Sequence, residues 1–92
     1  MKVNFYATLR QIVGSKSKEL PLPNGTTIRQ LIEAVISDYP ALRPVLFDEK
    51  GQLHGHVHVF INGRDAPYLH GGLEATLAPD DTVDVFPATG GG

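Results

Sequence analysis

Three consecutive glycines, Gly90, Gly91 and Gly92, stand at the end of the 92-residue sequence. Glycine has no side chain to pack and loses the most backbone entropy on folding, so we expect this segment to be mobile. It offers a thin, unbranched chain with a terminal carboxylate, and residues 88–92 reach about 17 Å when fully extended. Such a chain end suits insertion into the active site of another protein. A frayed terminus or a linker remnant is the alternative interpretation of the same glycines.

Histidines supply a second candidate site. His54, His56 and His58 alternate, which places them on one face of a predicted strand, and His70 follows a short way along the chain. Imidazoles at i and i+2 can share a zinc or nickel ion. Because no carboxylate or cysteine completes the set, we favour a solvent-facing strand and predict no bound metal. The chain contains no cysteine, which excludes disulfides, a thiolate nucleophile and a zinc–thiolate site.

Two further motifs are interpreted as turns. Gly71-Gly72 is not followed by Lys-Ser or by a helical pattern, so it does not predict a phosphate-binding loop. Asp80 and Asp81 lie in a predicted turn, and a catalytic pair of carboxylates needs a cleft that a domain of this size hardly forms. Neither motif therefore predicts catalysis.

Size and composition indicate one small soluble domain. A chain of 92 residues buries a single modest core, and contents of 41% hydrophobic and 20% charged residues fit a globular protein. A net charge of −2 without a run of Lys and Arg argues against a nucleic-acid partner. We find no apolar run near the roughly 20 residues of a membrane span and no signal-peptide pattern. We therefore predict no membrane partner and a cytoplasmic location.

Hydrophobic alternation predicts the strands that must position these motifs. Residues 2–9 form a half-buried strand, Val57, Val59 and Ile61 face inward on a third strand, and residues 82–87 form the last strand. Residues 18–22 form a short second strand with Leu20 and Leu22 inward, and its proline places it at a sheet edge. Asn62-Gly63 predicts a hairpin into another short strand at 65–69.

One helix is clear. Thr27 and Gln30 fit a capping box, Pro40 ends the helix, and the stripe between them has helical spacing: Ile28, Leu31, Ile32, Val35, Ile36 and Tyr39. Residues 41–47 predict a helical turn that covers one end of the core, followed by a turn at 48–51. The order of elements predicts an α+β fold: a mixed sheet of four to five strands with one main helix on one face. The first and last strands should lie side by side at its centre.

Four segments carry a family resemblance: VFINGRD (59–65), GGL (71–73), LAPDDTV (77–83) and FPATGGG (86–92). In these segments, and over essentially the whole domain, the chain resembles the MoaD/ThiS family of sulfur-carrier proteins, relatives of ubiquitin. The resemblance implies a ubiquitin-like β-grasp domain at 1–87 and a flexible Gly-rich tail at 88–92. Gly90 departs from the pattern, since relatives more often keep a small residue with a side chain there. The long connection at 40–55 favours the longer, MoaD-like branch over the compact thiamine-type carriers.

The resemblance implies a protein co-substrate that has no catalytic residues of its own and binds no cofactor. A carboxyl terminus has a pKa of about 3.5, so it is ionised and a poor electrophile at neutral pH. A ubiquitin-activating-like adenylyltransferase would use ATP to convert the carboxylate of Gly92 into an acyl-adenylate. Sulfur delivery, with a sulfurtransferase as a further partner, would then give a thiocarboxylate. Gly91 and Gly92 are the activated pair, preceded in the tail by Ala88, Thr89 and Gly90.

The outer face of the sheet, opposite the helix, predicts a docking surface. Alternation places Tyr6, Phe60 and Phe86 there beside His58, and exposed aromatic clusters often mark protein contacts. The resemblance implies the same, because the family uses this side of the sheet against its partners. Cross-strand pairing that only stabilises the sheet is the alternative.

Several functions stay open at this level. The favoured one is a sulfur carrier that serves an acceptor enzyme or the large subunit of a synthase, with molybdopterin synthesis ahead of cysteine, thiamine or tRNA pathways. A ubiquitin-like protein modifier, joined to lysines through Gly92, is the first alternative. An inert β-grasp interaction domain is the second.

Overall fold

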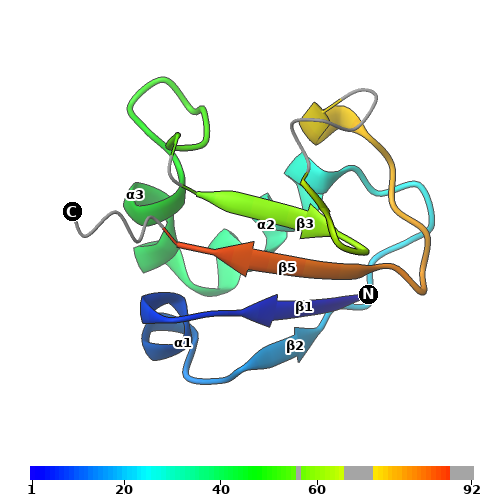
Figure 1. The fold of residues 1–92 in the computed structure, drawn as a ribbon, viewed down its shortest axis with the longest axis horizontal. Coiled ribbons are helices and arrows are strands. Elements are labelled where there is room, and N and C mark those ends of the chain that lie inside the picture. The colour runs from blue at the N-terminus through cyan, green and yellow to red at the C-terminus, as the bar shows by residue number, and fades with distance from the viewer. Residues whose placement is uncertain (56, 66–71, 88–92) are drawn as a thin grey trace.

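Five strands form one mixed sheet in the order β2-β1-β5-β3-β4 (Figure 1). The computed structural model describes residues 1–55, 57–65 and 72–87. β1 (Lys2–Phe5) and β5 (Thr82–Phe86) run parallel at the centre, and β3 (His58–Ile61) is antiparallel to β5. The short strands β2 (Ser17–Glu19) and β4 (Arg64–Asp65) form the two edges. The predicted sheet, with its first and last strands adjacent, is confirmed.

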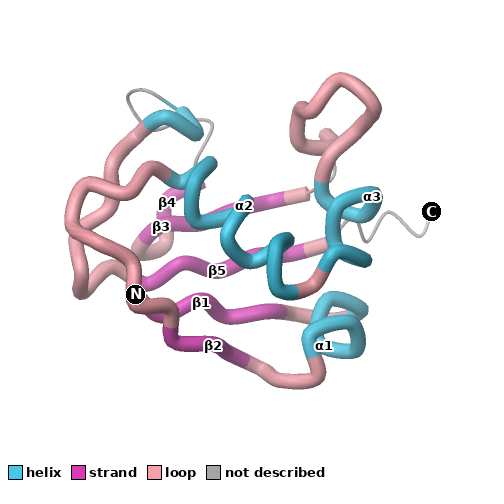
Figure 2. Tube along the Cα trace, turned by 180° about the vertical axis from the view of Figure 1, so that it is seen from behind, coloured by secondary structure: helices cyan, strands magenta, loops and turns pink. Residues whose placement is uncertain are grey.

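Helix α2 (Ile28–Asp38) covers one face of this sheet (Figure 2). Its N-terminus has the predicted capping box: Gln30 N donates to Thr27 Oγ1 at 3.1 Å, and Thr27 N donates to Gln30 Oε1 at 2.9 Å. Two short helical turns follow, η1 (Pro40–Leu42) and α3 (Arg43–Leu46), and bury Leu42 and Leu46. The predicted main helix and the helical turn after it are both confirmed.

The hydrophobic core lies between α2 and the inner face of the sheet. Inward positions alternate along each long strand, as the period of a half-buried strand requires. The strand residues of the core are Val3, Phe5, Val59, Ile61, Val83 and Val85. Their neighbours in sequence are left on the outer face, which carries the candidate site.

The predicted first strand at 2–9 is wrong beyond Phe5. Leu9 N donates to Tyr6 O at 3.1 Å, which closes a turn, and α1 (Thr8–Val13) begins there. Ala7, expected to face inward, is exposed and has φ 52° and ψ −127°. Leu9 is buried, but from a helix, and Val13 joins it one turn later. The alternation of apolar residues continued past the end of the strand only by coincidence.

The two edge strands differ from their predicted bounds. β2 ends at Glu19, because beyond it Leu22 N donates to Leu20 O in a local turn. Its edge position is confirmed, and Leu20 and Leu22 still pack against the core. The hairpin at Asn62-Gly63 is confirmed by φ values of 51° and 86°. β4 begins one residue earlier than predicted, and residues 66–69 lie outside the described residues.

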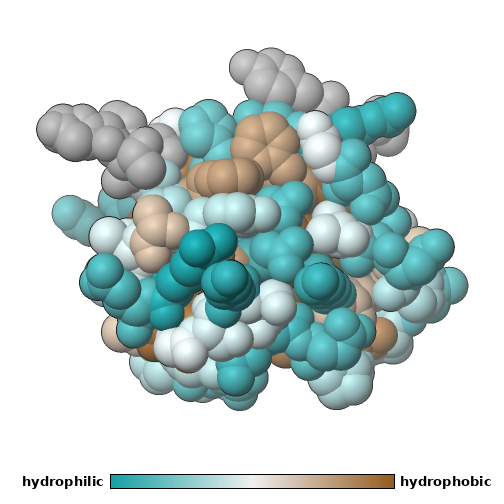
Figure 3. Space-filling model, turned by 60° about the horizontal axis from the view of Figure 1, so that its bottom comes forward, coloured by the Kyte–Doolittle hydropathy of each residue, from teal (hydrophilic) through white to brown (hydrophobic). Residues whose placement is uncertain are grey.

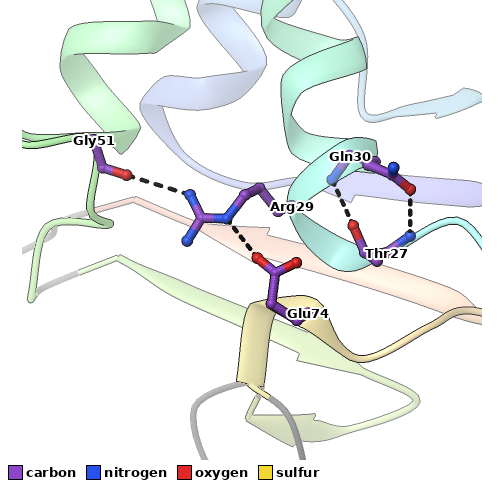
Figure 4. A network of polar contacts seen from close by, with 5 residues as sticks. All are labelled: Thr27, Arg29, Gln30, Gly51 and Glu74. Atoms are coloured by element: carbon purple, nitrogen blue, oxygen red, sulfur yellow. Dashed lines mark hydrogen bonds and ion pairs between the residues drawn. The ribbon is translucent and has the colours of Figure 1, made fainter.

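Arg29 connects α2 to two loops on the helix side of the molecule (Figure 4). Its Nε donates to Glu74 Oε1 at 2.9 Å, in the turn η3 (Gly72–Glu74), and its Nη1 donates to the carbonyl of Gly51 at 3.4 Å. Both charged side chains are well exposed, so the ion pair itself contributes between about 0 and 1 kcal/mol. Its role is to hold the 48–54 loop and η3 against the helix.

We expect Ala7→Gly to stabilise the protein. The backbone of Ala7 is that of the first central residue of a type II′ turn, a conformation that favours glycine. Relief of this strain should exceed the added entropy of the unfolded chain and raise the free energy of unfolding by about 1 kcal/mol. Urea denaturation measures the difference. In the control, Ala34→Gly inside α2 should lower the same quantity by about 0.5–1 kcal/mol. A less stable Ala7→Gly variant would contradict the prediction.

Candidate functional site

Strand register brings the candidate residues together on the face of the sheet opposite α2. Phe60 lies across from Asp84 on one side and from Asp65 on the other, while His58 lies across from Phe86. Directly paired residues project from the same face of a sheet. The buried residues between them, such as Val59 and Val85, face the core instead. All five paired residues therefore share the outer face.

Three aromatic rings contact one another there. The rings of Tyr6 and Phe86 are stacked, with centroids 4.2 Å apart, and Phe60 meets Phe86 edge-to-face at 5.4 Å. The imidazole of His58 lies 6.0 Å from the ring of Phe60. We call Tyr6, Phe60 and Phe86 the aromatic surface. Figure 3 shows hydrophobic side chains gathered on this side of the molecule with hydrophilic ones around them.

The partial burial of the aromatic surface fits either of the two roles considered for it. Tyr6, Phe60 and Phe86 are only partly accessible to solvent. His58 is more exposed, with about half of its side chain accessible. Stacked and edge-to-face pairs stabilise a sheet by themselves. The rings nevertheless keep apolar area in contact with water, which a partner could cover. The structure thus brings the four predicted docking residues together, and docking itself stays a proposal.

Asp84 anchors a hydrogen-bond network beside these rings. Its Oδ1 accepts from Asn4 Nδ2 at 2.8 Å and from the Tyr6 hydroxyl at 3.0 Å. The hydrogen bond to Asp84, followed by burial and by the negative charge of Asp84, raises the pKa of Tyr6. A phenol is already protonated at neutral pH, and the raised pKa extends the range in which Tyr6 remains a donor toward more alkaline pH. The network fixes both the ring of Tyr6 and the carboxylate of Asp84.

Two further charged groups border the aromatic surface. Arg10, on α1, donates from Nε to the carbonyl of Phe5 at 2.7 Å and places its guanidinium 5.2 Å from the centroid of the Tyr6 ring. This is the geometry of a cation–π contact. On the other side, His58 Nδ1 lies 3.2 Å from Asp65 Oδ2. The aromatic surface therefore has the basic Arg10 on one side and the acidic Asp65 on the other.

The hydroxyl of Tyr6 provides a direct test of the network. Asp84→Asn keeps an oxygen acceptor but removes the charge, so the pKa of Tyr6 should fall back toward its ordinary value of 10.0. Ultraviolet titration of the phenols measures this change, and a Tyr6→Phe variant assigns the transition. An unchanged transition in Asp84→Asn would show that Asp84 does not control the ionisation of Tyr6.

The aromatic surface lies at the end of the sheet where β5 stops. Phe86 is the last residue of β5, and Pro87 after it is buried. The short helices α1 and α3 lie at this same end of the molecule (Figure 1). The predicted tail and activation residues, Ala88 to Gly92, lie outside the described residues. A partner on the aromatic surface would thus contact the residue two positions before that segment.

The alternating histidines, considered as a metal site and not favoured, are separated where the structure describes them. β3 begins at His58, so His54 precedes the strand, and its Nε2–H donates to the carbonyl of Pro44 at 3.0 Å. His58 instead faces Asp65, while His56 and His70 lie outside the described residues. Within the described ranges, there is no group of three His, Cys, Asp or Glu residues that could hold a metal ion.

The remaining sequence motifs have structural roles where they can be seen. The Asp81 carboxylate accepts from Ala78 N at 2.8 Å and from Asn62 Nδ2 at 2.9 Å, which joins the turn before β5 to the hairpin. Gly72 begins η3 with φ 53°, while Gly71 lies outside the described residues.

An open groove of about 540 Å³ lies elsewhere, between α3 and the 48–54 loop, and Pro44 and His54 are among its lining residues. No helix among the described residues is long and apolar enough to cross a membrane.

Sequence reasoning missed Asp84 and Arg10. Asp84 lies between the inward residues Val83 and Val85, so alternation alone places it on the outer face. Its contact with Asn4 depends on the parallel register of β1 and β5, which the sequence does not give. Arg10 follows directly after the predicted strand at 2–9, and the sequence pattern predicts no helix there that would position it. Its position over Tyr6 requires the turn at Ala7 and the helix that follows.

The sheet order and the single main helix across the sheet define a ubiquitin-like β-grasp protein. The ThiS family model matches residues 3–92, and the chain therefore belongs to the ThiS family of ubiquitin-like sulfur carriers. The resemblance found in the sequence is confirmed.

Named relatives and solved structures agree with this assignment. The chain is 32% identical to small archaeal modifier protein 3 of Haloferax volcanii over 100% of this chain and 98% of that protein. It is 31% identical to the sulfur carrier protein CysO of Mycobacterium tuberculosis over 75% of each chain. The crystal structure of small archaeal modifier protein 1 from Haloferax volcanii superposes with a TM-score of 0.86 at 27% identity, over 100% and 98% of the two chains. A chain of the Amycolatopsis orientalis BexX/CysO complex gives 0.77 at 29% identity, over 99% and 98%.

Proposed function

We propose that this chain is a sulfur carrier that is activated at the carboxylate of Gly92. The carboxylate attacks the α-phosphate of ATP in the active site of a ubiquitin-activating-like adenylyltransferase and displaces pyrophosphate. A sulfide equivalent, delivered with the help of a sulfurtransferase, then displaces AMP from the acyl-adenylate. The product is a thiocarboxylate, a sulfur nucleophile that requires no cysteine, and this chain contains none.

One observation carries this proposal: the family match continues through the last glycine, to residue 92. Glycine suits the reaction because the acyl carbon of Gly92 has no Cβ beside it to obstruct an attacking nucleophile. The chemistry is supplied by the partner enzyme, so this chain acts as a co-substrate. ATP binds to that enzyme and not to the carrier.

The aromatic surface is the proposed docking site for the adenylyltransferase and then for the sulfur acceptor. Phe86 ends β5, so docking there brings the segment after Pro87 to the partner's active site over a short length of chain. The solved BexX/CysO complex supports the general idea that carriers of this family bind other proteins. We propose the large subunit of a molybdopterin synthase as the first acceptor to test, because the long 40–55 connection resembles the MoaD-like branch.

A second candidate function is protein modification. It is favoured by the printed names of the relatives from Haloferax volcanii, which are small archaeal modifier proteins. The first step would be the same adenylation at Gly92. The acyl group would then pass to the amine of a lysine and form an isopeptide bond, in place of transfer to sulfur.

Mass spectrometry of the protein purified from its native cells separates these functions. A mass increase that corresponds to the exchange of one oxygen for sulfur, on a fragment ending in Gly92, supports the carrier. Lysine peptides with a remnant of the glycine terminus support the modifier. If neither product forms in the presence of the organism's own adenylyltransferase and ATP, an inert interaction domain is the better description.

A further inference from the structure

Asp84 places one negative charge within the aromatic surface. It lies between Asn4 on β1 and Phe60 on β3 in the sheet, with Phe86 two residues further along its own strand. Its Oδ1 accepts hydrogen bonds from Asn4 and Tyr6, and both donors are neutral side chains. The carboxylate is therefore held in a fixed orientation, and neither donor brings a positive charge to balance its negative one.

The basic groups on the same face do not pair with Asp84. The guanidinium of Arg10 is held by the carbonyl of Phe5 and the ring of Tyr6, and His58 faces Asp65. Lys2 lies two residues before Asn4 on β1 and is directly opposite Glu19. Among the described residues, no nitrogen of Lys, Arg or His lies within ion-pair distance of Asp84.

An unpaired carboxylate in a contact surface selects its partner by charge. Asp84 is partly exposed in the free protein, and a docked protein that covers the aromatic surface would remove it from solvent. A purely apolar partner would then bury an uncompensated charge, which opposes binding. A partner with a basic side chain at this point gains a charge-assisted hydrogen bond. Proteins without such a side chain bind more weakly.

We propose that the protein docked on the aromatic surface inserts an arginine or lysine that pairs with Asp84. The inference rests on the proposed function, in which an adenylyltransferase covers Tyr6, Phe60 and Phe86. Oδ1 already has two donors, whereas Oδ2 accepts no hydrogen bond from the described residues and is the atom for the basic group. The expected partner surface is an apolar depression with one basic side chain at its edge.

The test uses the purified adenylyltransferase encoded by the same organism as the probe, with the dissociation constant measured by calorimetry at several NaCl concentrations. Asp84→Asn is nearly isosteric and should weaken binding about 10- to 100-fold at low salt, with a flatter dependence on salt. Asp80→Asn makes the same change of charge in the exposed turn before β5 and should bind like the wild type. Equal unfolding midpoints of both variants and the wild type exclude loss of the fold.

A charge exchange makes the test specific for a pair. The basic residues of the adenylyltransferase are replaced by Glu one at a time, and each variant is measured against wild-type carrier and Asp84→Lys. One replacement should weaken the wild-type carrier strongly and be rescued at least tenfold by Asp84→Lys.

Two results would overturn the inference, and they are distinguishable. If Asp84→Asn binds as tightly as the wild type, or more tightly, while Phe60→Ala and Phe86→Ala weaken binding, the surface is a docking site without a basic anchor. If the two aromatic variants also bind like the wild type, the proposed docking surface is wrong and the basic anchor falls with it.

Discussion

Deletion of Gly92 should slow adenylation of this protein by about a hundredfold or more, although the shortened chain still ends in Gly90-Gly91. The deletion moves the terminal carboxylate back by roughly 3.5 Å. A displacement of even about 1 Å at a reacting atom can lower a rate by around a hundredfold. Pyrophosphate exchange with the organism's adenylyltransferase measures the first step directly. Thermal unfolding should be unchanged, because the hydrophobic core among the described residues ends at Val85, well before Gly92.

Gly91→Val tests the width of the tail and leaves its length unchanged. A β-branched side chain restricts the backbone and widens the chain where an enzyme channel must enclose it, so exchange should be slowed at least as strongly as by the deletion. Gly55→Val is the matched control, since Gly55 is exposed, has no left-handed φ and has open space around an added Cβ. That variant should react normally. If both tail variants exchange pyrophosphate at the wild-type rate, the terminal glycines are only a frayed end. The proposal of a sulfur carrier then loses its support.

The elements with strong local signals were predictable from the sequence. Helix α2 combines a complete apolar stripe with a capping box, so local preference and core packing specify the same element. The Asn62-Gly63 turn is similarly determined, because both residues adopt the positive φ that this hairpin requires. The central strands follow from alternation, and the adjacency of the first and last strands follows from the order of elements and the crossover rule.

Helix α1 was not predictable by the same reasoning, because a strand pattern and a helix pattern overlap at its start. Leu9 continues the alternation of β1, yet Leu9, Ile12 and Val13 also have the i, i+3, i+4 spacing of one helical turn. Gly14, with φ 79°, is the matching helix end. The deciding feature is the positive φ of Ala7. Alanine rarely adopts a positive φ, so the sequence does not predict a turn at this residue.

The aromatic residues and His58 of the candidate site were predictable, whereas Asp84 and Arg10 were not. Alternation gave the outer face to Tyr6, Phe60 and Phe86, and the ring contacts require no more than neighbouring strands. The polar part depends on register, because a shift of one residue would separate Asp84 from both Asn4 and Phe60. Spacing along the chain contains no information about such partners.

The second large effect concerns these rings. Phe60→Ala and Phe86→Ala should each weaken binding of the adenylyltransferase by about 2 kcal/mol, roughly 30-fold, if they are central contacts. Alanine is preferable to aspartate, since a carboxylate at position 60 would lie directly between Asp84 and Asp65 and destabilise the sheet by repulsion. The double variant should lose the T-shaped contact of 5.4 Å but keep the buried core, and therefore still unfold cooperatively.

The matched control for the aromatic variants is Tyr39→Ala on the helix side. Tyr39 is also a half-buried aromatic residue and ends α2, where its ring lies 5.6 Å from the Nζ of Lys18. Its truncation removes a comparable ring from the opposite side, so it should lower stability without changing the dissociation constant. Docking through the outer face predicts losses of binding for Phe60 and Phe86 and none for Tyr39. Equal losses for all three would mean that binding follows overall stability, and equal affinities for all three would place the partner elsewhere on the molecule.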